Sequence, residues 1–260
     1  MLKEKIVLIT GASAGIGAAC AHAFAREGCR LILAARRLDN LQALSADLDK
    51  EHGAGCHTIQ LDVRDREQVN QAIADLPSAW SDIDILVNNA GLSRGLDKVQ
   101  DALHTDWDEM IDTNVKGLLW VSRAVMPGMV ARDNGHVINI GSIAGRQVYP
   151  GGNVYCATKY AVRAITQGMR IDLLGTKVRC SSVDPGMVET EFSEVRFHGD
   201  TARAEKTYQT FPPLKADDIA ETVLFCATRP PHVNIHDILI MPQDQAAVYA
   251  SHPRGIGKDL

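Results

Sequence analysis

Short strand-like segments in this chain are apolar throughout, and that constrains the fold more than any other feature of the sequence. The segments IVLIT, LILAA, DILVN and VINI lack a regular alternation of apolar and polar residues. A strand of this kind needs cover on both faces, which a parallel sheet with helices on both sides provides. We therefore expect an α/β fold with a mostly parallel sheet.

Longer helical stretches alternate with these segments along the chain. We expect strands at residues 5–10, 30–35, 56–61, 83–88, 136–141, 177–183 and 235–240, and helices at residues 16–27, 41–50, 66–74, 107–131, 153–174 and 216–227. Asp39 is the predicted N-cap of the second helix. Seven strands joined by helical crossovers predict one doubly wound, Rossmann-like domain over residues 1–260.

Residues 185–213 differ from the rest of the chain because they show no clear periodicity. A connection that is this long and aperiodic is typical of a functional loop. We predict that it forms a substrate lid within the single domain, with Gly199 as a hinge.

The charge balance is mildly acidic, with 27 Lys and Arg against 32 Asp and Glu and a net charge of −5. No run of basic residues exceeds two, which argues against binding to nucleic acid or to an anionic membrane. No apolar stretch approaches the ~18 residues of a membrane span, and the N-terminus shows no signal-peptide pattern. The six cysteines are scattered without C-x-x-C spacing, so we expect reduced thiols in a cytoplasmic protein rather than a redox or zinc site.

A glycine-rich turn follows the first expected strand and leads directly into a helix. Its glycines are Gly11, Gly15 and Gly17, spaced G-x-x-x-G-x-G. Glycines permit a tight turn, and they let backbone N–H groups and the N-terminus of the helix approach a pyrophosphate. The strand–turn–helix context therefore predicts a dinucleotide-binding loop, which also includes Ser13, Ala14 and Ile16. A plain turn before a glycine-packed helix is the alternative.

Further motifs follow this turn in order. The chain carries NNAG at 88–91, Asn114 in the long helix, Gly141 and Ser142 after the fifth strand, YxxxK at 155–159, and Pro185 and Gly186 after the sixth strand. Together with the glycine turn, this set resembles the short-chain dehydrogenase/reductase family over nearly all 260 residues. The resemblance implies an oxidoreductase that acts on CH–OH or C=O groups with a nicotinamide cofactor.

The end of the second strand indicates which cofactor binds. Arg36 and Arg37 stand there, where NAD-binding proteins of this fold carry an acid. Two guanidiniums can bind a phosphate through charge-assisted hydrogen bonds, so we predict NADP(H), with the Ser13 hydroxyl on the same 2′-phosphate. Asp39 would be the selecting acid on the alternative interpretation, but it falls at the start of the next helix. The resemblance implies further cofactor contacts from Asp62, Val63, Asn88, Asn89, Tyr155, Lys159, Pro185, Gly186, Val188 and Thr190.

Tyr155 and Lys159 lie four residues apart and therefore on one face of a helix. A free phenol has a pKa of ~10, and a neighbouring ammonium lowers that pKa. The pair suits a carbonyl reductase in which Tyr155 donates a proton to the carbonyl oxygen while the cofactor delivers hydride. We expect Ser142 to hydrogen-bond the same oxygen and Lys159 to bind the nicotinamide ribose. The resemblance implies that Asn114 holds a water molecule of a proton relay from Lys159.

Longer strings at 148–155, 189–200 and 231–235 resemble the branch that contains NADP-dependent 3-hydroxy acid dehydrogenases and sulfoacetaldehyde reductases. That branch implies a small anionic substrate, which a guanidinium near Ser142 and Tyr155 would bind. The candidates are Arg94, Arg146 and Arg196, and we expect Tyr149 to line the same pocket. Members of this branch tend to carry a small or neutral residue followed by Trp at the position where this chain has Arg146-Gln147. The difference favours a more polar pocket and puts serine in doubt as the substrate.

Two other functions stay open at this point: a general carbonyl or 3-oxoacyl reductase of the same family, and a protein that binds NADP without turnover. The intact Ser142, Tyr155 and Lys159 argue against the second. We predict no metal site from the histidines. We predict a homo-oligomer, a tetramer, because the expected helices at 107–131 and 153–174 carry more apolar surface than one sheet face can bury.

Overall fold

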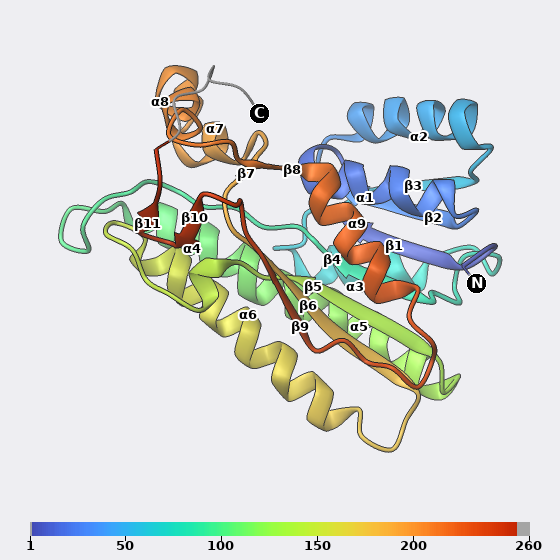
Figure 1. Ribbon diagram of the computed structural model, residues 1–260. Helices are drawn as coiled ribbons and strands as arrows, with labels where there is room; N and C mark the ends of the chain where they lie inside the picture. The colour runs from blue at the N-terminus through green and yellow to red at the C-terminus, as the bar shows by residue number, and fades with distance from the viewer. Residues whose placement is uncertain (1, 254–260) are drawn as a thin grey trace.

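A seven-stranded parallel sheet forms the centre of the computed structural model, which describes residues 2–253 (Figure 1). The strand order is β3-β2-β1-β4-β5-β6-β9, and every neighbouring pair is parallel. The strands are β1 (Ile6–Thr10), β2 (Arg30–Ala35), β3 (Cys56–Gln60), β4 (Ile85–Asn88), β5 (Gly135–Ile140), β6 (Val178–Pro185) and β9 (Asp237–Ile240). The doubly wound α/β fold predicted from the apolar strands is confirmed.

Helices cover both faces of this sheet (Figure 1). One layer contains α1 (Gly15–Arg26), α2 (Leu38–His52) and α9 (Ala216–Ala227). The other contains α3 (Arg66–Ala74), α5 (Leu118–Ala131) and α6 (Asn153–Asp172). The sheet therefore has an apolar core on each side.

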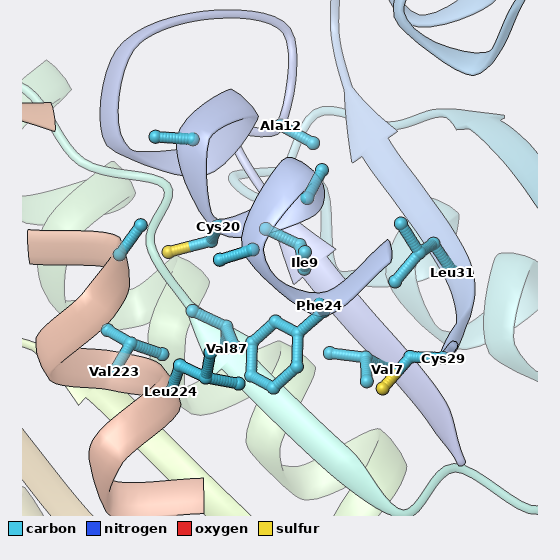
Figure 2. Packing of buried hydrophobic residues seen from close by; sticks show 14 of the residues in the cluster. Val7, Ile9, Ala12, Cys20, Phe24, Cys29, Leu31, Val87, Val223 and Leu224 are labelled. Atoms are coloured by element: carbon cyan, nitrogen blue, oxygen red, sulfur yellow. The ribbon is translucent and has the colours of Figure 1, made fainter. Parts of the chain in front are cut away.

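Strand β1 shows why the central strands are apolar at every position. Val7 and Ile9 belong to the core that also contains Phe24 of α1, while Ile6 and Leu8 belong to the core beneath α5. Figure 2 shows Phe24 packed between the sheet and α9. Because successive side chains of a strand point to opposite faces, two buried faces require an apolar residue at each position.

The helix predicted at 107–131 begins earlier and is interrupted. It consists of α4 (His104–Ile111), a π-helical turn (Asp112–Gly117) and α5. The π-helical turn contains Asn114, and such turns frequently occur at functional sites. The π-helical turn reads DTNVKG, without proline, and helix continues directly on both sides, so the sequence does not reveal the change in hydrogen bonding.

The aperiodic segment 185–213 contains short elements of its own. They are β7 (Val188–Glu189), α7 (Phe192–Arg196) and α8 (Thr201–Thr207), and β7 pairs with β8 (Leu214–Lys215). Elements of two to seven residues are too short to produce a recognisable hydrophobic period. The remaining elements are a 3-10 turn (Ile143–Gly145) and the hairpin of β10 (Gln245–Ala247) and β11 (Ala250–Ser251).

The predicted start of the second helix is wrong. Arg37 is the N-cap residue of α2, and Asp39 lies in the first turn, where a negative charge still stabilises the helix dipole. The other predicted boundaries shift by up to two residues. Within residues 2–253, no helix is both long enough and apolar enough to cross a membrane.

Candidate active site

A crevice opens where the strand order reverses. Strands β2 and β3 lie on one side of β1, and β4, β5 and β6 lie on the other. The loops at the carboxyl ends of the strands diverge at such a point and leave a binding site. A cavity of about 240 Å³ lies there, called the cofactor cavity below. Of the predicted site residues, it is lined by Gly11, Ala14, Gly15, Ile16, Arg37, Asn89, Ser142, Tyr155, Lys159, Pro185, Gly186, Val188 and Thr190.

The glycine turn is held against β4 by close backbone contacts. The Asn89 side chain donates hydrogen bonds to the carbonyl oxygens of Thr10 at 2.9 Å and Gly11 at 3.2 Å. A Cβ on Gly17 would approach the Gly11 oxygen to 2.3 Å, so only glycine fits there. The N-cap of α1 is Ala14, whose methyl group cannot accept a hydrogen bond. The first-turn N–H groups of α1 therefore face the cavity as donors for an anion.

Arg37 extends the anion-binding chemistry at this end of the cavity. Its Nε and Nη2 donate to the Ser13 hydroxyl at 3.3 and 3.2 Å, and its Nη2 donates to Glu191 at 3.0 Å. Arg36 turns away toward Glu109, with 3.9 Å between Nη1 and Oε1. The guanidinium of Arg37 and the hydroxyl of Ser13 are thus the two predicted phosphate ligands that the structure brings together.

Six predicted cofactor residues lie outside the lining of this cavity: Ser13, Gly17 and Arg36, described above, and Asp62, Val63 and Asn88. Asn88 is buried between strands and donates to Ser122 and Asn139, both at 2.9 Å. Val63 packs against the π-helical turn, and Asp62 pairs with the guanidinium of Arg64 at 2.6 Å. Their positions at strand ends are as predicted, but the contacts seen here support the strand ends rather than the cavity wall.

The predicted catalytic side chains converge on the cofactor cavity. Tyr155 and Lys159 project from α6 and are 8% and 7% exposed, and Ser142 follows β5. The Lys159 ammonium donates to the Ile140 carbonyl at 2.9 Å and lies 6.0 Å from the centre of the Tyr155 ring. Three groups from two elements are therefore fixed around one space by the core beneath them.

Burial is the largest influence on the pKa values of both Tyr155 and Lys159. Burial lowers the pKa of Lys159 to about 8, and the Asp184 carboxylate opposes that shift. Burial raises the pKa of Tyr155, while Arg196 and a hydrogen bond with Ser142 act in the opposite direction. We expected Lys159 to lower the phenol pKa, but the cation that does so here is Arg196. A phenol that stays protonated is suited to donate a proton to a carbonyl oxygen.

Asn114 lies beside this group with its side chain fully engaged. Its amide exchanges hydrogen bonds with the backbone of Leu92, both at 2.8 Å, and donates to Thr158 at 3.0 Å. A Cβ placed on Gly91 would lie 3.2 Å from the Asn114 oxygen and 3.7 Å from the Lys159 ammonium. Asn114 and Lys159, the two residues of the predicted proton relay, are therefore neighbours, and Gly91 lies against both of them.

Two of the three candidate anion ligands are occupied elsewhere. Arg94 donates to Glu109 at 2.7 Å and also to the carbonyl of Val195. Arg146 donates twice to the buried Asp184, at 2.8 and 2.6 Å. Within the described residues neither guanidinium lines the cavities that contain Tyr155 and Ser142 together. These ion pairs fix loops around the site.

Arg196 is the candidate that faces the catalytic tyrosine. Its guanidinium carbon lies 5.4 Å from the centre of the Tyr155 ring, and its Nη2 donates to the Tyr149 hydroxyl at 3.1 Å. Its Nε is buried and has no hydrogen-bond partner among residues 2–253. Arg196, Tyr149, Tyr155 and Ser142 line a second cavity of about 270 Å³, the substrate cavity below. A buried donor without a partner is uncommon, and Arg196 is the candidate arginine that lines this cavity.

Several lining residues were missed from the sequence. They are Ala90, Gly91, Ile140, Gly141, Glu191, Phe192 and Val195. The Phe192 ring lies edge-on to Tyr155, with 5.6 Å between the ring centres. Most of the missed residues directly adjoin a predicted one, so extending each motif by one residue would have found them.

The fold and this site define a member of the short-chain dehydrogenase/reductase family. A family model described as short chain dehydrogenase matches residues 5–200, and the chain belongs to that family. It is 50% identical over 242 residues to the NADP-dependent 3-hydroxy acid dehydrogenase YdfG of Salmonella typhi, covering 93% of this chain and 96% of that protein. It is 44% identical over 245 residues to the NADP-dependent 3-hydroxy acid dehydrogenase of Schizosaccharomyces pombe, covering 94% and 95%. The solved closed form of serine dehydrogenase complexed with NADP+ is 47% identical, with a TM-score of 0.89 over 96% of this chain and 99% of that chain.

Proposed function

We propose that this protein is an NADP-dependent oxidoreductase that interconverts a small 3-hydroxy acid, or a related hydroxysulfonate, and its aldehyde. The observation that carries the proposal is the Arg196 guanidinium, which faces Tyr155 in a cavity that also contains Ser142. The names of the similar proteins support the same cofactor and substrate class.

The cofactor cavity suits NADP chemically. Gly11 and Gly15 and the free first turn of α1 would hold the pyrophosphate, and Arg37 with Ser13 would hold the 2′-phosphate. Arg36 adds positive charge at the same strand end. Lys159 would hold the nicotinamide ribose. The bound cofactor accepts or supplies the hydride.

Side chains of the protein then transfer the proton to or from the substrate oxygen. In the reducing direction Tyr155, kept protonated by burial, donates to the carbonyl oxygen while Ser142 hydrogen-bonds the same oxygen. Lys159 and Asn114 form the proton relay behind Tyr155. In the oxidising direction the same groups take the hydroxyl proton away.

Arg196 gives the site its preference for an anion. A carboxylate or sulfonate that accepts from the Arg196 guanidinium would place a carbon two or three bonds away near Tyr155. Arg196 lies in α7, within residues 185–213, so we also propose that this segment is the substrate lid. Its closure would bring Arg196 and Phe192 onto the bound substrate.

Absorbance of NADPH tests this function directly. Tag-free enzyme with NADP+ should oxidise 3-hydroxypropionate or 2-hydroxyethanesulfonate far faster than 1,3-propanediol. In Arg196→Ala, KM for the acids should rise while turnover of the diol stays unchanged. Arg66→Ala, on the exposed start of α3, is the control for a general loss of positive charge. A wild-type enzyme that prefers the diol, or uncharged ketones, would instead favour the general carbonyl reductase.

We also propose a cytoplasmic homotetramer. All six cysteines are free, which suits a reducing compartment. Ile171 and Leu174 at the end of α6 are 68% and 78% exposed, and Leu119 on α5 is 37% exposed. Contact with other copies would cover these side chains. Light scattering at micromolar concentration should give four times the 28.2 kDa chain mass, and a 28.2 kDa species would refute the oligomer.

A further inference from the structure

Two imidazoles and one carboxylate meet on the outer surface of the layer formed by α1 and α2. His22 lies on α1, while Glu51 and His52 form the last turn of α2. One potential ligand atom from each of these three side chains lies within 4.8 Å of the other two. The residues are 29 and 30 positions apart in sequence, so the sequence spacing does not reveal the group.

The separations between these atoms match the ligands of a metal better than a direct hydrogen bond. His22 Nδ1 lies 3.4 Å from Glu51 Oε2, and His52 Nε2 lies 3.7 Å from the same oxygen. Direct hydrogen bonds between nitrogen and oxygen are typically about 2.7–3.2 Å long. Ligands held about 2.0–2.1 Å from one tetrahedral zinc ion are roughly 3.3–3.4 Å apart. The separations of Glu51 from His22 and from His52 are therefore close to those of neighbouring zinc ligands. Small rotations of these exposed side chains would bring the two imidazole nitrogens to a similar separation.

The surroundings also suit a cation. The three side chains are 40%, 54% and 24% exposed, so water can reach the site and complete the coordination. Glu51 and His52 stand at the C-terminal end of a 15-residue helix, where the carbonyl groups carry partial negative charge. Two imidazoles favour zinc, nickel or copper over magnesium and calcium, which prefer oxygen ligands.

The geometry points to a binding site for a divalent transition metal, zinc, with His22, Glu51 and His52 as its ligands. It would link α1, which begins at the glycine turn, to α2, which begins at Arg37. Within residues 2–253 none of the three lines the cofactor cavity or the substrate cavity. The site is therefore structural, and it is independent of the proposed catalytic function.

Calorimetric titration of tag-free, EDTA-treated protein with ZnCl2 tests the site. We expect one zinc per chain with micromolar or tighter affinity, and a rise in Tm on addition of zinc. His22→Gln and Glu51→Gln should each weaken the binding at least ten-fold and abolish the rise in Tm, while NADPH binding is unchanged. His104→Gln, an exposed histidine on α4, is the matched control and should bind zinc like the wild type.

Two results would overturn this assignment. One is the absence of zinc binding at micromolar concentration in wild-type protein. The other is zinc binding that survives in both His22→Gln and Glu51→Gln. His232→Gln with His236→Gln would then test the other histidine pair, which lies before β9. Cobalt absorption in the wild type, lost in His22→Gln, would confirm nitrogen coordination even if zinc stabilises the fold only slightly.

Discussion

The cofactor end of the crevice is built on the ends of β1, β2 and β4, whereas the substrate end depends on short elements between β6 and α9. At the first end, backbone N–H groups and Arg37 surround the cavity on strands anchored in two apolar cores. At the second end, Arg196 comes from a five-residue helix. Hydrogen bonds from the Gly95 N–H to the Arg196 carbonyl and from the Arg94 guanidinium to the Val195 carbonyl hold that helix in place.

This difference separates what the fold requires from what selects the substrate. A parallel sheet that reverses its strand order leaves a crevice whatever the loops contain. We propose that substrate selection lies in the segment 185–213, which can change without disturbing the cores. The two ends meet at Tyr155, which lines both cavities.

The largest expected effect is at this meeting point. Tyr155→Phe removes the proton donor and keeps the ring that packs on Phe192, so kcat should fall by at least about 10²-fold. The Kd for NADPH, measured by fluorescence, should change little. A variant that keeps more than about a hundredth of wild-type turnover would exclude Tyr155 as the acid.

The buried ammonium of Lys159 should lower the stability of the folded protein, although we propose that it serves catalysis. Its pKa is about 8 in the folded protein against 10.5 for an ordinary lysine, so the unfolded chain holds this proton more tightly. Relative to Lys159→Met, the wild type should therefore gain up to about 3 kcal/mol of stability as pH rises from about 8 to 10.5. The difference between the two proteins is the measure, because the raised pKa values of the buried cysteines lower the stability of both as pH rises. Lys159→Met should be inactive, more stable at pH 7, and free of this pH dependence.

Urea denaturation of cofactor-free protein at pH 7 and pH 10 measures the effect. The exposed Lys50→Met is the control, and it should unfold like the wild type at both pH values. If Lys159→Met is less stable than the wild type at pH 7, the buried ammonium is compensated by its neighbours and the account of its pKa is wrong.

Removing both arginines at the cofactor end should change cofactor selection. Arg36→Ala combined with Arg37→Ala should weaken NADPH by about 1.5–3 kcal/mol, the value of charge-assisted hydrogen bonds, with little effect on NADH. Arg66→Ala, on the exposed start of α3, controls for net charge. Equal losses for both cofactors would show that these guanidiniums do not contact the 2′-phosphate.

A smaller effect is expected where the two ends touch. Glu191 pairs with Arg37 at 3.0 Å, and both side chains are about half exposed. The carboxylate competes with a phosphate for the same guanidinium, so Glu191→Gln should tighten NADPH by at most about 1 kcal/mol. Glu189→Gln, a nearby acid on β7, should leave NADPH unchanged. Weaker NADPH binding in Glu191→Gln would mean that the pair orders Arg37 for the phosphate instead.

The sequence predicts the cofactor end better than the substrate end. The glycine turn, Arg37 and the NNAG motif follow strands whose apolar runs fix their positions, and the catalytic pair follows from helical spacing. The choice among three arginines did not follow from the sequence, because Glu109 and Asp184 neutralise two of them through contacts 15 and 38 residues away. The π-helical turn at Asn114 was not predicted either, because its residues, DTNVKG, contain no proline and join two helices without a break.

One kinetic experiment that varies cofactor and substrate together tests most directly whether Arg37 and Arg196 recognise two separate anions. We would measure kcat/KM of wild type and Arg196→Ala with NADP+ or NAD+ against 3-hydroxypropionate or 1,3-propanediol. The account predicts that Arg196→Ala reduces the preference for the acid by about ten-fold or more and leaves the preference for NADP+ unchanged. An unchanged preference for the acid, or a parallel loss of the preference for NADP+, would contradict separate recognition of the two anions.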